Sequence, residues 1–147
     1  MDGDASLLTL GAISSNLRLV PNSNVTFAGS GETRTATIST VSGRTGSSTV
    51  QTTGSDGQSS ASVDVKVQVG GNSNNTLSGT EVADLILGQN GDDILSGMGA
   101  SDVLCGANRN DRLSGGSGAD TMDGGLGTDT TSNYAAKGMP GRTYRSC

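Results

Sequence analysis

The sequence lacks histidine and tryptophan altogether, and its 147 residues include only one phenylalanine and two tyrosines. Without histidine the chain cannot build a histidine-containing zinc site, a Ser-His-Asp triad or a histidine pH switch. With so few aromatic side chains and 24 glycines, it cannot bury a large globular core. We therefore expect ordered repeats or bound metal to stabilise the fold.

Cysteine and long apolar runs are also scarce. Cys105 and Cys147 are too few for a disulfide framework, and they could either form one pair or stay as free thiols. The N-terminal MDGDASLLTLGAI has no basic segment, and its apolar run is too short for a signal peptide or a membrane span. Either the protein is not exported by the general secretory route, or this chain is a piece of a longer one.

Negative charge is concentrated in one part of the chain. Residues 70–132 contain nine acidic residues and two arginines, a net charge of −7, whereas the other residues contain five acidic and seven basic ones, a net charge of +2. The acidic segment argues against a nucleic-acid partner and favours cations. No EF-hand loop, nucleotide-binding glycine motif or G-x-S-x-G elbow is present.

The acidic segment is a repeat. From Gly70 it divides without insertion or deletion into GGNSNNTLS, GTEVADLIL, GQNGDDILS, GMGASDVLC, GANRNDRLS, GGSGADTMD and GGLGTDTTS. Position one is always glycine, position six is aspartate in every repeat but the first, and position eight is apolar in every repeat but the last. A flexible Gly/Ser linker would not keep three columns in register.

These repeats resemble the RTX, or haemolysin-type, calcium-binding nonapeptide, whose pattern is G-G-x-G-x-D-x-U-x with U apolar. Ser73, Val82, Ala100 and Arg109 depart from the glycine of position four. The resemblance implies a parallel β-roll over residues 70–132, in which six residues turn and three form a strand. Two repeats complete one coil, and position eight faces inward because strand residues alternate between faces.

Alternate turns of such a roll lie on opposite sides, so the position-six residues form two columns. Carboxylates about 5 Å apart repel by roughly 3 kcal/mol at an effective dielectric constant near 20. Ca²⁺ between them reverses the sign, because it accepts six to eight carboxylate and carbonyl oxygens. The resemblance thus implies Ca²⁺ as the cofactor, with binding that contributes to folding. At most five sites follow, at the pairs Asn75/Asp93, Asp93/Asp111, Asp111/Asp129, Asp84/Asp102 and Asp102/Asp120.

Other turn residues are further candidate metal ligands. They occupy positions one, three and five of the repeats: Gly88, Asn90, Asp92, Gly106, Asn108, Asn110, Gly115, Ser117 and Gly124. We expect the Asp93 turn to be the strongest site, because Asp92 adds a nearby charge, although Asp92 itself lies off the ligand column. The Asn75 pair lacks one charge, and Arg109 adds a cation near Asp111, so the sites are not expected to be equal.

The residues before the repeats are typical of an antiparallel β-sheet. Five Thr/Ser/Val-rich stretches predict short strands: residues 16–20, 24–29, 33–40, 48–55 and 60–69. LRLVPNSNVTFAGSGETRTATIST followed by GSDGQSSASVDVKVQV is similar to a cadherin-like or Ig-like module of bacterial surface proteins. One or two initial strands of that module are missing, so we expect a partial β-sandwich over residues 1–69 within a longer polypeptide. Residues 133–147 predict an irregular tail in which Tyr134 could cover the open end of the roll.

The sequence thus predicts an all-β chain: a parallel β-roll preceded by a partial antiparallel β-sandwich. We expect a bacterial, secreted or cell-surface calcium-binding structural or adhesion module, with no catalytic residues, nucleic-acid partner or membrane span. One alternative is a self-assembling or partner-binding solenoid that uses a patch of Leu85, Ile94 and Val103, the outward residues of position seven. Another is the non-catalytic C-terminal part of a secreted RTX enzyme or toxin.

Overall fold

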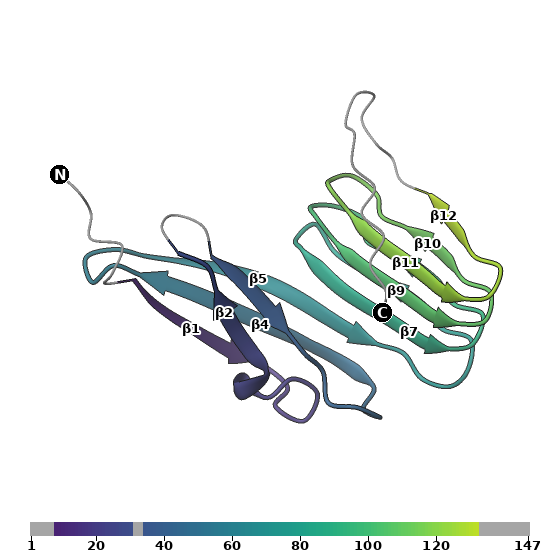
Figure 1. The fold of residues 1–147 in the computed structure, drawn as a ribbon, viewed down its shortest axis with the longest axis horizontal. Coiled ribbons are helices and arrows are strands. Elements are labelled where there is room, and N and C mark those ends of the chain that lie inside the picture. Colours follow the sequence, from purple (N-terminus) through teal and green to yellow (C-terminus); the bar gives the residue numbers. More distant parts are fainter. Residues whose placement is uncertain (1–7, 31–33, 133–147) are drawn as a thin grey trace. The chain divides into compact units, whose positions relative to one another are not determined.

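The computed structural model describes residues 8–30 and 34–132, which fold almost entirely as β-strands (Figure 1). The chain divides into two compact units, residues 1–44 with 48–65, and residues 45–47 with 66–147. The predicted tail and its Tyr134 cap lie outside the described residues. No helix among the described residues is long and apolar enough to cross a membrane.

The first unit contains antiparallel strands, as predicted. Strand β1 (Thr9–Ser14) pairs with β4 (Gly46–Ser55), with Ala12 opposite Thr52. A tight turn connects β4 to β5 (Ser60–Val69), because the carboxylate of Asp56 accepts the N–H groups of Gln58 at 2.9 Å and Ser59 at 2.7 Å. Strands β2 (Val25–Ala28) and β3 (Thr35–Ile38) form a separate hairpin that follows the short 3-10 turn η2 (Asn22–Asn24).

Four of the five predicted strands are present in this unit, and the first prediction is wrong. Residues 16–20 form a turn, because the side-chain oxygen of Asn16 accepts the N–H groups of Arg18 at 3.2 Å and Leu19 at 3.3 Å. Leu19 and Val20 are buried as anchors of this turn. The additional strand β1 was not predicted, because its apolar pattern does not follow its faces: Ile13 is 68% exposed, whereas Ser14 is buried.

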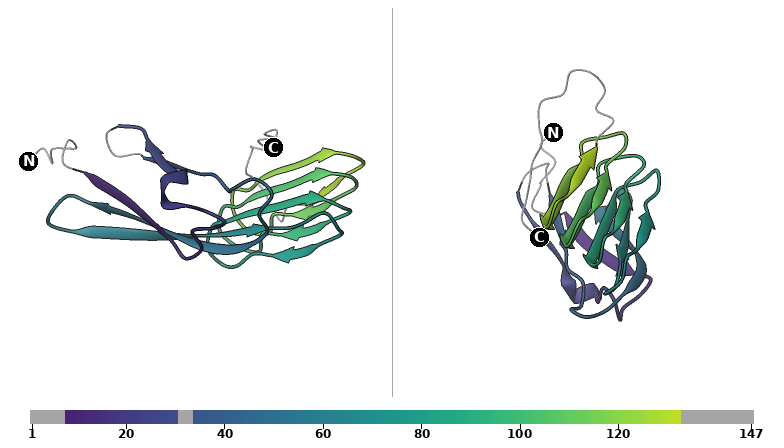
Figure 2. Two further views of the ribbon diagram at one scale, coloured as in Figure 1. Left: turned by 90° about the horizontal axis from the view of Figure 1, so that it is seen from below. Right: turned by 90° about the vertical axis from the view of Figure 1, so that its right-hand side faces the viewer.

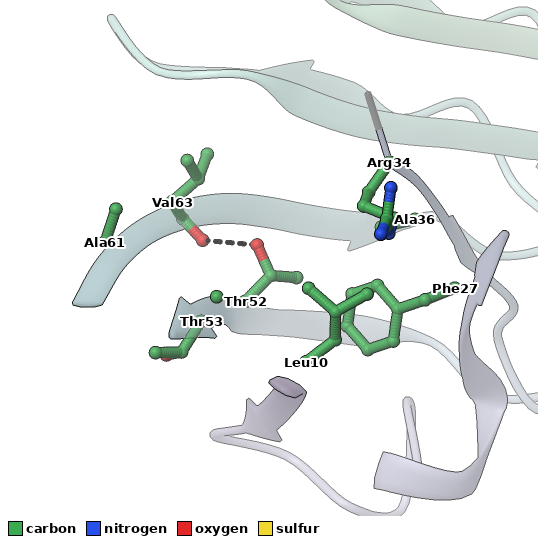
Figure 3. Close-up of a pocket in the computed structure, with 9 residues that line it drawn as sticks. Leu10, Phe27, Arg34, Ala36, Thr52, Thr53, Ala61 and Val63 are labelled. Atoms are coloured by element: carbon green, nitrogen blue, oxygen red, sulfur yellow. Dashed lines mark hydrogen bonds between the residues drawn. The ribbon is translucent and has the colours of Figure 1, made fainter. Parts of the chain in front are cut away.

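A shallow cavity of about 140 Å³ lies in the first unit between the β2–β3 hairpin and strands β1, β4 and β5 (Figure 3). Leu10 of β1, Phe27 of β2, Thr52 of β4 and Val63 of β5 line it, and Val63 is 60% exposed. Ligand pockets usually measure about 300–1,000 Å³. The cavity therefore reflects incomplete packing between the hairpin and these strands and does not mark the functional site.

The second unit is a parallel roll with two sheets. One sheet contains the end of β5 with β7 (Asp84–Asn90), β9 (Val103–Asn108) and β11 (Thr121–Leu126), which lie side by side in Figures 1 and 2. The other contains β6 (Thr76–Ser78), β8 (Ile94–Ser96), β10 (Arg112–Ser114) and β12 (Thr130–Ser132). Leu85 pairs with Val103, and Ile94 with Arg112, so each coil consists of two repeats. The predicted β-roll is confirmed.

The apolar column of position eight fills the interior of the roll, as predicted. Its core is Ile86, Leu95, Leu104, Leu113 and Met122, with Leu77 partly buried against them. Burying one such side chain contributes about 1.5–3 kcal/mol. One coil therefore buries little apolar surface, and the stack depends on its neighbours.

Two geometric expectations for the roll are wrong. Strands β7, β9 and β11 are longer than three residues, because their pairing continues into the next repeat, where Asn90 lies opposite Asn108. The patch predicted from Leu85, Ile94 and Val103 does not form, because consecutive repeats alternate between the two sheets. Ile94, which is 49% exposed, therefore lies on the opposite face from Val103, which is 44% exposed.

A polar side chain, that of Gln68, lies at the start of the first coil. Gln68 of β5 lies in register with Ile86, and its amide donates to the carbonyl of Ser78 in β6 at 2.5 Å. This bond gives β6, the first strand of the sheet that contains the three-residue strands, a partner on its outer side. Cys105 of β9 is buried and disulfide-bonded, so it is not a free thiol, and Cys147 lies outside the described residues.

Candidate metal sites in two aspartate columns

The turns of the roll form two edges. The first, third, fifth and seventh repeats turn at one edge, called here the odd edge, with residues 70–75, 88–93, 106–111 and 124–129. The second, fourth and sixth repeats turn at the even edge, with residues 79–84, 97–102 and 115–120. Each edge carries one of the two predicted columns of position-six residues.

All five predicted pairs of position-six residues are brought together. In each pair the backbone N–H of the earlier residue donates to Oδ1 of the aspartate one coil later. The distances from donor nitrogen to Oδ1 are 2.7 Å for Asn75 to Asp93, 2.8 Å for Asp93 to Asp111, 2.9 Å for Asp111 to Asp129, 2.9 Å for Asp84 to Asp102 and 3.0 Å for Asp102 to Asp120. The bonds orient every carboxylate along its column.

The second carboxylate oxygen of the central aspartates has no hydrogen-bond partner. Oδ2 of Asp93, Asp102 and Asp111 is buried and unpaired, and so is Oδ1 of Asp84 at the start of the even column. The side chains themselves are only 1–2% exposed. Leaving an ionised carboxylate buried without a partner is strongly unfavourable. A bound cation is the kind of partner that these oxygens lack.

A backbone carbonyl faces each of these carboxylates. A methyl group built on Gly79 would lie 2.5 Å from both Asp84 Oδ2 and the carbonyl oxygen of Gly97. We call this space between a position-six side chain and a glycine carbonyl a cradle, and it recurs along both edges. Together with the one just described, the cradles use five glycine carbonyls: those of Gly88, Gly97, Gly106, Gly115 and Gly124. Four of these glycines were predicted as ligands, and Gly97 was missed. Carboxylate and carbonyl oxygens are the donors that Ca²⁺ prefers, so the residues present fit this ion.

Burial also changes the proton affinity of the columns. It raises the pKa of Asp102 to about 6; the hydrogen bond from the Asp84 N–H opposes this rise, and repulsion from the carboxylates of Asp120 and Asp84 adds to it. Burial likewise raises the pKa of Asp93 and of Asp111. Each column therefore resists holding negative charge in the folded state without a cation.

Several other predicted ligands form side-chain ladders on the odd edge. The amide of Asn108 donates to Asn90 at 3.0 Å, and the amide of Asn90 donates to Asn72 at 2.9 Å. The side-chain oxygens of Asp92 and Asn110 accept N–H groups from the following turn at 3.1 Å and 2.8 Å. Ser117 is exposed on the even edge. Their role as metal ligands stays a prediction.

No group of three carboxylate or thiol side chains converges on a metal-binding position among residues 8–30 and 34–132. Each site along a column instead joins two position-six side chains, and the carbonyls of the turns would supply the other oxygens. Such a donor set suits calcium better than a transition metal, which prefers nitrogen and sulfur ligands.

Five non-glycine residues in the turns have a left-handed backbone. They occupy positions two and four, with φ between 70° and 83°: Gln89, Met98, Ala100, Ala107 and Arg109. A residue with a Cβ loses roughly 1–2 kcal/mol in this conformation. The departures from glycine that are visible in the sequence therefore destabilise the middle turns of the roll.

Comparison with protein families identifies the repeat segment. Residues 69–104 and 99–131 match the family model of the RTX calcium-binding nonapeptide repeat. No curated protein and no solved structure matches the chain significantly. With the unbroken repeat, the two-sheet roll and the carboxylates that face glycine carbonyls, this match shows that residues 69–131, somewhat less than half of the chain, are an RTX calcium-binding nonapeptide repeat segment.

Proposed function

We propose that this chain is an extracellular, non-enzymatic structural module whose β-roll folds when Ca²⁺ binds between stacked turns. The observation that carries this proposal is the unpaired, buried carboxylate oxygen of Asp84, Asp93, Asp102 and Asp111. Each of these aspartates lies in a cradle that a glycine carbonyl also faces. Without a cation, these oxygens are desolvated and have no compensating interaction.

The energetic scale supports coupling between calcium binding and folding. Neighbouring carboxylates in a column repel by roughly 3 kcal/mol per pair at an effective dielectric constant near 20. The net stability of a domain is only about 5–15 kcal/mol, and each coil of this roll contributes only two side chains to the apolar core. Calcium that binds the folded state and not the unfolded one shifts this balance by mass action.

An extracellular or cell-surface location fits such sites. Extracellular calcium modules bind with dissociation constants of about 10⁻⁴–10⁻³ M, which suits millimolar external calcium. In the calcium-poor cytosol the roll would remain unfolded and available for export. We propose a spacer, folding cap or adhesion stalk in a bacterial surface or secreted protein as the biological role.

A catalytic role within these residues is not proposed, because the chain has no histidine and no nucleophile motif. The chain could still form the non-catalytic end of a secreted enzyme or toxin. Self-association through position seven has no supporting observation, because Ile94 and Val103 belong to different faces of the roll.

Calcium titration of the full chain, followed by circular dichroism, tests the proposal. We expect a gain of β-sheet signal near millimolar calcium, its reversal by chelator, and its loss in the double variant Asp93→Ala/Asp102→Ala, which removes a central aspartate from each column. Asp64→Ala is the control, because it removes an exposed carboxylate of β5 that lies outside both columns. A spectrum indifferent to calcium and to chelator would contradict the proposal.

A further inference from the structure

The odd edge has connections between its turns that do not need a cation. Beside the aspartate column, Asn72, Asn90 and Asn108 of position three form a continuous amide ladder. Position five forms a second ladder, in which the side-chain oxygens of Asn74, Asp92 and Asn110 each accept an N–H from the next turn at 2.8–3.1 Å. Three side-chain ladders therefore run along this edge, including the aspartates.

The even edge cannot form the same connections. Position three contains Gly99 between Glu81 and Ser117, so no amide ladder is possible. At position five, Ala83 and Ala119 have no polar side chain, and the described bond is a single one from the Ala119 N–H to Ser101 Oγ at 3.3 Å. The aspartate column is the continuous side-chain link of this edge.

The backbone links and the central aspartates are alike on the two edges. Backbone bonds join successive turns on both, at 3.1 Å from Asn90 to Gly71 on the odd edge and at 3.0 Å from Gly99 to Thr80 on the even edge. Asp93 and Asp102 occupy equivalent central places, each 1% exposed with one unpaired oxygen. The side chains at positions three and five therefore make the difference.

We propose that the even-edge sites, at Asp84/Asp102 and Asp102/Asp120, are the ones at which calcium holds the roll together, whereas the odd-edge turns stay connected when an ion is lost. This inference rests on the proposed function, since it assigns the coupling between calcium and folding to one column. Calcium at the odd edge adds to turns that are already linked. Calcium at the even edge supplies the main link beyond the backbone.

A matched pair of variants in the full chain tests the inference. Asp93→Asn and Asp102→Asn each remove one charge from the middle of a column, at equal burial. With saturating calcium, hydrogen–deuterium exchange is measured on the turns around each site. We expect the even-edge turns of Asp102→Asn to lose protection by roughly tenfold or more, which corresponds to about 1.4 kcal/mol. The odd-edge turns of Asp93→Asn should change severalfold less. Equal losses would overturn the inference.

A gain-of-ladder variant decides the matter if both substitutions prevent folding. Ala83→Asn/Ser101→Asn places on the even edge the residue type that accepts N–H groups at position five of the odd edge. We expect this variant to fold at a lower calcium concentration and to exchange its even-edge amides more slowly. An unchanged calcium midpoint and unchanged exchange would contradict the inference. A wild-type chain that folds without regard to calcium would instead contradict the proposed function itself.

Discussion

The odd and even edges of the roll face the same electrostatic problem with different side chains. Both stack buried aspartates in which one carboxylate oxygen binds a backbone N–H and the other has no partner. Only the odd edge adds asparagine ladders that connect its turns across the 18-residue interval. The family motif describes the columns that the edges share, whereas positions outside the motif decide how much each edge depends on the ion.

The largest expected difference is between the central sites of the two edges, Gly97 and Gly88, and comes from adding a methyl group there. A methyl group on Gly97 would contact Asp102 and lie 2.5 Å from the carbonyl oxygen of Gly115, whereas on Gly88 the equivalent carbonyl of Gly106 is 3.0 Å away. We expect Gly97→Ala to cost about 3 kcal/mol and Gly88→Ala about 1–2 kcal/mol, the range of overpacked sites. Chemical denaturation in saturating calcium measures both, and equal costs would remove this difference between the two central sites.

Lowering the pH is expected to have the next largest effect on the stability of the roll. It should stabilise the roll in chelator and destabilise it in calcium. Because the pKa of Asp102 in the fold, about 6, lies above the ordinary 3.8, protonation favours the folded state. This contribution is complete below 3.8 and is lost as the pH rises through about 6. In chelator, the β-sheet signal should therefore increase as the pH falls from about 7 to about 5. With calcium present, acid should weaken binding, because protons compete for the ligands.

The matched variants Asp93→Asn and Asp102→Asn also show which carboxyl group causes this pH dependence. Asp102→Asn should remove more of the acid response in chelator than Asp93→Asn does, because repulsion from column neighbours on both sides adds to burial at Asp102, whereas at Asp93 only Asp92 adds to burial. Circular dichroism across the pH range provides the measurement. An acid response that survives Asp102→Asn unchanged would show that other carboxyl groups control it.

Cutting the amide ladder should have a smaller effect that is confined to the odd edge. Asn90→Ala removes the bonds to Asn72 and from Asn108. Because the ladder is exposed, we expect a loss of about 1 kcal/mol, near the typical net value of a hydrogen bond. Ser117→Ala, at position three of the even edge, is the control and should change the stability by less than about 0.5 kcal/mol. Similar losses in both variants would contradict a stabilising role for the ladder.

The smallest effect is expected from relieving the strain of a left-handed backbone at alanine, and it should be equal on the two edges. Ala100 of the even edge has φ of 70°, and Ala107 of the odd edge has φ of 81°. Replacing either by glycine should stabilise the roll by about 0.5 kcal/mol, since the relief of the left-handed strain exceeds the added chain entropy. Ala119→Gly is the control and should destabilise. Denaturation midpoints in calcium that fall in the Ala100→Gly or Ala107→Gly variants would show that the strain is not relieved.

The roll was predictable because its columns follow a strict interval. Leu95 and Leu104 are buried, and Asp93 lies one coil from Asp111, as position eight and position six indicate. Successive residues of a strand point to opposite faces, so the position of a residue within the repeat determines whether its side chain faces inward or outward. The β-strand at residues 60–69 was predictable for the same reason, because Val63 to Val69 alternate with polar residues.

The pairing of asparagines was not predictable from the motif. Asn90 and Asn108 are obvious oxygen donors near the ligand column, and only their spacing across one coil places the amides in contact. The same coil geometry separates Ile94 from Val103, although their positions in the repeat are equal. In the first unit, the local bonds of Asn16 override the strand propensity of residues 17–20. Side-chain hydrogen bonds of this kind compete with strand formation and do not show in an apolar pattern.

A crystal structure of the full chain grown with calcium would show directly whether Ca²⁺ joins the stacked turns. We expect ions in both columns, each bound by the unpaired oxygen of a central aspartate, such as Asp93 or Asp102, and by the glycine carbonyl that faces it. The turns of the even edge should be at least as well occupied as those of the odd edge. Aspartates turned out to solvent, with no ion between the coils, would contradict a role for Ca²⁺ in holding the roll together.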